Sequence, residues 1–322
     1  MQNKAVFSYA CGKVILVGEH AVVYGSQAIG LPIEQGLRVA IYKLEQTILE
    51  QKKGPMLRGL GLFSGDLFFG DKSFGPAIFY EVLDYLVSSF GEKIKDLAIV
   101  LEMEILPSRG LGSSAALSVA LIKAIYQYFE LDLTQTKLFE HTTYLETLFH
   151  SRPSGIDHSV IIKNKPIGFK KINTELTSWP IELELGLTLV VGTMGPHIGT
   201  KNAVAKLACR MSSNQKSYER IFAEINELAK DMEKALVLGQ KTVVGELMNF
   251  SQGYLNALGV SCAILENLCF IARNTGALGA KLTGAGSGGA VIALADGNEE
   301  DIHKAFIAGG YQSFITRIAA TK

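Results

Sequence analysis

The feature that most constrains this chain is a glycine- and serine-rich run, ILPSRGLGSSAAL, at residues 105–117. Residues 97–105 are apolar and rich in β-branched side chains, which predicts a strand. Residues 115–125 are almost continuously apolar, which predicts a buried helix. Glycines let a loop turn its N–H groups to one point, and a helix N-terminus adds unpaired donors. The run therefore predicts a phosphate-binding loop, although an ordinary core helix with a Gly/Ser cap shows the same pattern.

This loop is neither a Walker loop nor part of a dinucleotide-binding motif. No Gly-Lys-Ser or Gly-Lys-Thr closes it. A second run at residues 281–290 does satisfy G-x-G-x-x-G, but a dinucleotide fingerprint must open a helix. Residues 290–294, AVIAL, predict a strand instead. The second run is therefore a glycine loop between strands, and a plain glycine-rich hairpin is the alternative.

Ionisable residues interrupt the apolar segment GKVILVGEHAVVYG at residues 12–25. Lys13, Glu19 and His20 stand among expected strand residues, where a charge is costly to bury without a partner. We expect them to face a polar cavity. A satisfied Glu19–His20 pair at a strand end explains the pattern equally well.

A third segment combines an expected helix with a turn. Residues 134–149 predict a helix that Thr134 opens, and PSGID follows at residues 153–157. Proline and glycine there mark a turn, which leaves Asp157 close to a helix start. A lone aspartate at such a position is most often a helix cap.

Taken together, these segments resemble the GHMP kinases, the superfamily of galactokinase, homoserine kinase, mevalonate kinase and phosphomevalonate kinase. PSRGLGSSAA resembles the central motif, the run at residues 279–294 resembles the third, and GEHAVVYG resembles the first motif in its mevalonate kinase form. PSGID is similar to the segment that supplies the family's catalytic aspartate. Glu146, eleven positions before Asp157, stands where the family places a magnesium-binding glutamate. Cys11 departs from the pattern, because the family usually has proline there.

The resemblance implies a two-domain α+β fold. The N-terminal domain, expected at residues 1–172, would contain a left-handed β-α-β crossover. The C-terminal domain, expected at residues 173–322, would be ferredoxin-like. ATP and substrate would bind in the cleft between the two domains.

The resemblance also implies a role for each motif residue. Asp157 would accept or orient the proton of the attacking hydroxyl, and Lys13 would stabilise charge on that oxygen. Ser114 and Glu146 would bind Mg²⁺. Glu19, His20 and Thr200 would reach the substrate, although Thr200 is as readily a helix cap. The ATP phosphates would be held by Ser108, Arg109, Gly110, Leu111, Gly112, Ser113 and Ser114.

The reaction that the resemblance implies is ATP-dependent phosphorylation of the primary hydroxyl of mevalonate, a step of isoprenoid precursor synthesis. A phosphomevalonate or sugar kinase of the same superfamily is the nearest alternative, and the GEHAVVYG wording speaks against it. A non-catalytic protein that binds ATP and a metabolite is a second alternative. The presence of Lys13, Glu146 and Asp157 argues against it.

Composition indicates a globular protein with a large core, because 48% of the residues are hydrophobic and 19% are charged. The 322 residues carry 31 basic and 31 acidic side chains, so charge gives no reason to expect nucleic acid or an anionic membrane as a partner. No apolar run has the length of a membrane helix, and the first residues are too briefly apolar for a signal peptide. We therefore expect a cytoplasmic protein with four reduced cysteines, and homodimer formation is left open.

Other elements are expected from periodicity. We predict two strands separated by a loop within residues 5–25, a hairpin at 36–49, a short strand near 67–69 and a helix at 78–90. The second half predicts a strand at 187–193 and then helices, at 200–209, 215–238, 242–258 and 261–274.

Overall fold

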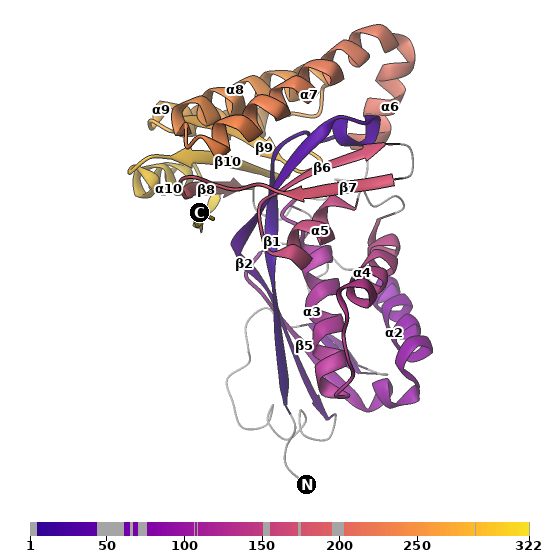
Figure 1. The fold of residues 1–322 in the computed structure, drawn as a ribbon. Helices are drawn as coiled ribbons and strands as arrows, with labels where there is room; N and C mark the ends of the chain where they lie inside the picture. The colour runs from indigo at the N-terminus through magenta and orange to yellow at the C-terminus, as the bar shows by residue number, and fades with distance from the viewer. Residues whose placement is uncertain are drawn as a thin grey trace. The chain divides into compact units, whose positions relative to one another are not determined.

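The computed structural model divides the chain into two compact units, each built from separate segments (Figure 1). The first unit comprises residues 1–12, 35–107 and 112–163, and the second comprises residues 13–34, 108–111 and 164–322. The structure describes residues 5–43, 61–64, 67–69, 76–105, 107, 109–150, 155–172, 175–194, 203–286 and 288–321.

Strands β1 (Val6–Val17) and β2 (Gln27–Lys43) contribute residues to both units, because the division falls within each of them. The other elements of the first unit are β3 (Gly61–Ser64), β4 (Leu67–Phe69), α2 (Pro76–Phe90), η2 (Glu92–Asp96), β5 (Leu97–Met103), α3 (Ser113–Tyr128), α4 (Gln135–Phe149) and α5 (Ile156–Lys163).

In the first unit, β5 pairs antiparallel with residues 37–43 of β2 and, on its other side, with β3. Helix α3 packs against α4 and α5, and α2 packs against α4 (Figure 1). Thirteen of the sixteen residues of α3 are buried, because its alanine and β-branched side chains give it an apolar surface all round. The helix that follows the first glycine loop is thus a core helix with a fixed N-terminus.

The second unit holds the remaining elements. They are η1 (Ala21–Tyr24), β6 (Ile167–Ile172), β7 (Glu175–Pro180), β8 (Leu187–Thr193), α6 (Ala203–Ser213), α7 (Gln215–Val237), α8 (Lys241–Ala257), α9 (Ala263–Asn274), β9 (Gly279–Thr283), β10 (Ala290–Ala295), α10 (Glu299–Ala308) and β11 (Gln312–Ile318). Strand β6 pairs with residues 27–30 of β2 on one side and with β7 on the other.

The C-terminal sheet is ferredoxin-like. Its strand order is β11-β8-β10-β9, and all its neighbours are antiparallel. Numbered along the chain, this is the order 4-1-3-2, with helices after the first and third strands. Helices α8 and α9 pack against β9, α10 packs against β8 and β11, and α7 lies beside α8 (Figure 1). The expectation of a ferredoxin-like arrangement is confirmed.

Two expectations for the N-terminal strands are wrong. Residues 6–17 form one continuous strand where a loop was expected near Cys11, and residues 36–43 continue β2 where a hairpin was expected. Gly36 bears on both differences, because it lies where β1 and β2 approach each other closely. A Cβ at Gly36 would lie 2.1 Å from the carbonyl oxygen of Ala10, so glycine here permits close contact between β1 and β2. Residues 44–49 of the expected hairpin lie outside the described residues.

Most of the other expected elements are confirmed. Helix α4 begins at Gln135, and the Thr134 hydroxyl caps it by accepting a hydrogen bond from the N–H of Lys137 at 3.2 Å. The strand at residues 187–193 and the helices α2, α7, α8 and α9 lie within two residues of their predicted bounds, whereas α6 begins at Ala203 and continues to Ser213. Within the described part of the chain, no helix is both long and apolar enough to span a membrane.

Candidate active site

The two glycine-rich runs meet inside the second unit. Gly110 has φ +78° and Gly284 has φ +82°, backbone conformations that residues other than glycine rarely adopt. A Cβ at Gly110 would lie 2.8 Å from the carbonyl oxygen of Thr283, and one at Gly284 would lie 2.6 Å from the Cα of Gly110. The Arg109 guanidinium donates to the carbonyl of Gly288 at 3.3 Å. The run that resembles the third motif therefore lies next to the run that resembles the central motif.

The loop continues into the first unit as the start of α3. Gly112, at φ +76°, is the N-cap residue, and Ser113 and Ser114 form the first turn. Gly112 has no side chain to bond the unpaired N–H groups of that turn, so they remain available to a ligand. The local backbone is therefore suited to bind an anion.

Ser114 lies beside the end of α4. Its hydroxyl is 3.1 Å from Nε2 of His150, the residue that caps α4 at its C-terminus. Glu146 is on the same helix, one turn before His150, and is only 2% exposed. If His150 accepts this hydrogen bond, the lone pairs of the Ser114 hydroxyl remain available. Ser114 and Glu146 thus supply a hydroxyl and a carboxylate, the hard oxygen ligands that fit Mg²⁺.

Asp157 lies in the first turn of α5, where the sequence places it. Its neighbour His158 is buried, and Nε2 of His158 lies 3.2 Å from the Thr143 hydroxyl of α4. Burial lowers the pKa of His158, and the negative charge of Asp157 partly offsets that effect. Asp157 is therefore carried by a helix that packs against both α3 and α4, the helices of Ser114 and Glu146.

Lys13 is buried in the second unit, with 2% of its surface exposed. Its backbone N–H donates to the carbonyl of Leu111 at 2.9 Å, and its ammonium donates to the carbonyl of Gly110 at 3.1 Å. Both bonds tie β1 to the phosphate-loop segment. The structure therefore brings together the lysine of the first motif and two residues of the central motif.

Glu19 has a partner that sequence reasoning missed. The ammonium of Lys281, on β9, forms an ion pair with Oε1 of Glu19, and both side chains are buried. Burial raises the pKa of Glu19, and the positive charges of Lys281 and Lys13 act in the opposite direction. The alternative of a Glu19–His20 pair is wrong, because Glu19 pairs with Lys281 instead.

His20 adopts an unusual backbone conformation at φ +61° and bonds to the third motif. Its Nε2 lies 3.1 Å from the carbonyl oxygen of Ala285. Because a carbonyl only accepts, Nε2 carries the proton and Nδ1 of the neutral ring is an acceptor. Burial lowers the pKa of His20, which favours this neutral form.

The predicted residues thus fall into two groups. Those in the first unit are Gly112, Ser113, Ser114, Glu146 and Asp157, and those in the second are Lys13, Glu19, His20, Arg109, Gly110 and Leu111. Ser108 and Thr200 lie outside the described residues, so their assigned roles stay predictions.

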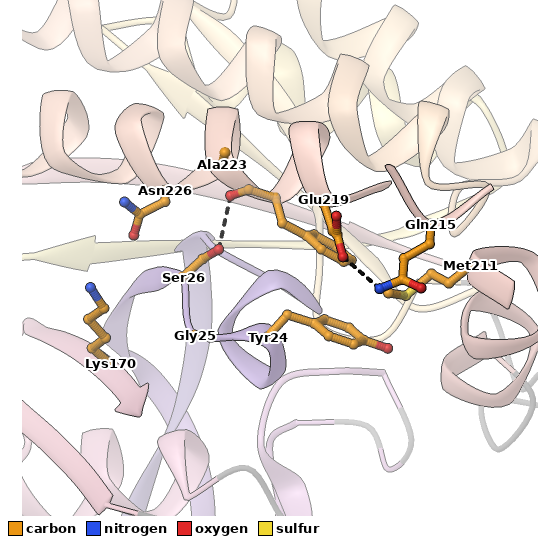
Figure 2. A pocket seen from close by; sticks show the side chains of 10 residues that line it. Tyr24, Gly25, Ser26, Lys170, Met211, Gln215, Glu219, Ala223 and Asn226 are labelled. Carbon is orange, nitrogen blue, oxygen red and sulfur yellow. Dashed lines mark hydrogen bonds between the residues drawn. The ribbon is translucent and has the colours of Figure 1, made fainter. Parts of the chain in front are cut away.

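A separate pocket of about 560 Å³ opens in the second unit between η1 and α7 (Figure 2). Tyr24 stacks on Phe222 with ring centroids 4.5 Å apart, and the Ser26 hydroxyl donates to the carbonyl of Phe222 at 2.9 Å. Gln215 donates to Glu219, one turn further along α7, at 2.7 Å. None of the predicted site residues that the structure describes lines this pocket.

Comparisons with known proteins agree with this architecture. Residues 77–164 match the model of the GHMP kinases N terminal domain, and residues 232–312 match that of the GHMP kinases C terminal domain. The chain is 33% identical to a mevalonate kinase of Thermococcus sibiricus and 34% identical to one of Pyrococcus horikoshii. In each case the match covers 98% of this chain and 96% of the relative.

A solved structure shows the same fold. The crystal structure of L. major mevalonate kinase in complex with R-mevalonate superposes with a TM-score of 0.80 at 23% identity, over 99% of this chain and 97% of that one. The two domain models and the full-length relatives therefore lead to one conclusion. The chain belongs to the GHMP kinase family, in its mevalonate kinase branch.

Proposed function

We propose that this protein transfers the γ-phosphoryl group of ATP to the primary hydroxyl of mevalonate, giving 5-phosphomevalonate. The observation that carries the proposal is the similarity to mevalonate kinases over nearly the whole chain, which includes all three glycine-rich or charged motifs. Phosphoryl transfer depends mainly on alignment and charge neutralisation. The proposed roles therefore concern binding, orientation and charge.

The ATP phosphates are proposed to bind at the loop and the first turn of α3. Positive φ at Gly110 and Gly112 and the uncapped N-terminus of α3 support this role. The backbone N–H groups there would accept negative charge without a lysine of the Walker type. Ser108 and Arg109 are proposed to flank the same phosphates.

Mg²⁺ is proposed to bind the Ser114 hydroxyl and the Glu146 carboxylate, with phosphate and water oxygens as its other ligands. When bound, the ion neutralises charge on the β- and γ-phosphates. The protein's own part is to hold two oxygen ligands in place. Burial of Glu146 and the hydrogen bond between Ser114 and His150 support that part.

Asp157 is proposed to orient the primary hydroxyl and accept its proton. Lys13 is proposed to stabilise the developing charge on that oxygen, and its two bonds to Gly110 and Leu111 would align it with the phosphate loop. The proton would pass to Asp157 as the new phosphorus–oxygen bond forms, while the bond from the γ-phosphorus to the bridging oxygen breaks and ADP leaves.

His20 is proposed to contact the substrate, together with Thr200. Its neutral ring has Nδ1 free of the Ala285 bond, so it can accept a hydrogen bond from a substrate hydroxyl. We propose that Glu19 supports this contact and does not make it directly, because one of its carboxylate oxygens is already paired with Lys281.

A coupled assay across mevalonate, phosphomevalonate, galactose and homoserine tests the proposal. We expect turnover of mevalonate with a kcat of about 1–100 s⁻¹, the usual kinase range. The variant His20→Ala should raise the KM for mevalonate far more than the KM for ATP, because it removes a substrate contact and leaves the phosphate loop intact. Turnover of phosphomevalonate without turnover of mevalonate would contradict the proposed substrate and leave the family assignment unchanged.

A further inference from the structure

Lys281 is a fully buried charge to which the reaction outlined above gives no role. It lies on β9, all five residues of which are buried, and α8 and α9 pack against this strand. Removing an ammonium from water costs several kcal/mol. A lysine at this position is therefore retained only with close partners.

All three donors of the Lys281 ammonium are used. One donates to Oε1 of Glu19, one to the carbonyl of Ile15 at 3.3 Å, and one to the carbonyl of Leu282 at 2.6 Å. Thr283 strengthens the same junction, because its hydroxyl accepts from the N–H of Ile15 at 2.8 Å. Lys281 thus joins β9 to the strand that carries Lys13.

The second oxygen of Glu19 is available to another donor. It is buried, and within the described residues it has no hydrogen-bond partner. A buried carboxylate oxygen is costly to leave unpaired, so such an atom is a site where a donor is expected. Lys13 is near enough to lower the pKa of Glu19 through its charge. Glu19 therefore lies under the influence of two lysines, one paired with it and one held at Gly110.

We propose that Lys281 is a positioning residue: paired with the Glu19 carboxylate and bonded to the carbonyl of Ile15, it holds β1 against β9 and thereby fixes the position of Lys13. The assignment rests on the proposed function, because that function gives Lys13 its role at the reacting oxygen. Lys281 itself is not proposed to touch substrate or ATP. It acts through Glu19.

The pH dependence expected of this arrangement has a definite sign. The titratable groups that act on Lys281 are Glu19, Lys13 and Cys269 of α9, and burial raises the pKa of the Cys269 thiol to about 12, which keeps it neutral. The groups that act on Glu19 are Lys281 and Lys13. Removing Lys281 leaves the effect of burial on the Glu19 pKa opposed only by a backbone hydrogen bond and by the charge of Lys13. Glu19 then binds a proton at higher pH.

The test compares Lys281→Met, Lys281→Arg, Glu19→Gln and the Lys281→Met/Glu19→Gln double variant with Lys241→Met. Lys241 is a suitable control because its ion pair with Asp296 lies at the surface of the same unit. We expect Lys281→Met to lower kcat for mevalonate by about 10²-fold, as for a small misplacement of a catalytic group. The acidic limb of its kcat/KM profile should move to higher pH, because Glu19 loses the cation that favours its ionised form. Lys281→Arg should restore part of the activity, and Lys241→Met should match the wild type.

The double variant keeps the test decisive if Lys281→Met fails to fold, because it removes both buried charges together. If Lys281 acts through Glu19, the double variant loses no more kcat than Glu19→Gln alone. Multiplicative losses, or a loss in Lys281→Met that does not change with pH, would overturn the assignment. An infrared band of a protonated carboxyl, present in Lys281→Met and absent from the double variant, reports on Glu19 without any turnover. The absence of this band from Lys281→Met would contradict the inference. Inactivity of the wild type on mevalonate would instead contradict the proposed function.

Discussion

The contact between Gly110 and Gly284 makes a quantitative prediction for Gly110→Ala. The new methyl group would lie 2.8 Å from the carbonyl oxygen of Thr283 and 3.0 Å from the Cα of Gly284, both of which are backbone atoms. Overpacking of this kind costs about 1–3 kcal/mol. The backbone at φ +78° adds a strain of about 1–2 kcal/mol for any residue with a Cβ. We therefore expect a total loss of about 2–5 kcal/mol in the free energy of unfolding.

Gly297→Ala is the matched control, because it separates the two contributions. Gly297 has φ +85°, and a Cβ there meets no atom within 4 Å. This variant should lose about 1–2 kcal/mol from strain alone. Urea unfolding curves of the two variants give the steric contribution as their difference, and kcat/KM for ATP should fall only in Gly110→Ala. Equal losses in the two variants, with normal kinetics, would refute the close contact between the central and third motifs.

Three further predictions concern the reaction and the pH response. Asp157→Asn should lower kcat by about 10²–10⁴-fold with unchanged ATP binding. When it is combined with Lys13→Met, the loss of kcat should be smaller than the product of the two single losses. A near-normal kcat in purified Asp157→Asn would identify the aspartate as a helix cap. Ser114→Ala and Glu146→Gln should each raise the Mg²⁺ concentration required, with partial rescue at high Mg²⁺, and an unchanged requirement in both would argue against the metal ligands. Burial lowers the pKa of His158 in the folded protein below its unfolded-state pKa of about 6.5. The stability linked to this shift is therefore fully present above pH 6.5 and is lost as the pH falls below it, so the melting temperature should fall between pH 7.5 and pH 5.5. A melting temperature that does not fall over this range would contradict the prediction.

Local signals predicted the elements that carry the site. The Thr134 cap, the strand at residues 187–193 and the strand–loop–strand at residues 279–295 depend on neighbours in sequence, and each formed as expected. Glycine was the ambiguous signal. At Gly110 and Gly284 it marks loops, whereas at Gly36 it lies within a long strand beside Ala10. Only the neighbouring strand distinguishes these cases, so the continuity of β1 and β2 was not predictable from sequence.

Lys281 shows a second limit of sequence reasoning. A lysine in a short apolar strand is ordinarily read as a solvent-facing residue, and its partner Glu19 lies in a distant segment of the chain. No spacing rule connects the two, because the third motif and the first motif meet only in the fold. The sequence held only an indirect signal that Glu19 has a buried cation as its partner. Glu19 is an acid in an apolar strand–loop segment, and a buried acid requires a cation from somewhere.

The charges of the second unit follow from this pairing. Lys13 and Lys281 are both buried, and two buried ammonium groups without an acid would repel each other at low effective dielectric. With Glu19 ionised, the three groups together carry one positive charge. Lys13 is the member bonded to the phosphate-loop segment, so this net charge is placed where an anionic phosphoryl group is proposed to bind. Glu19 therefore allows a second lysine to stabilise the β1–β9 junction while only one positive charge is presented to the reaction.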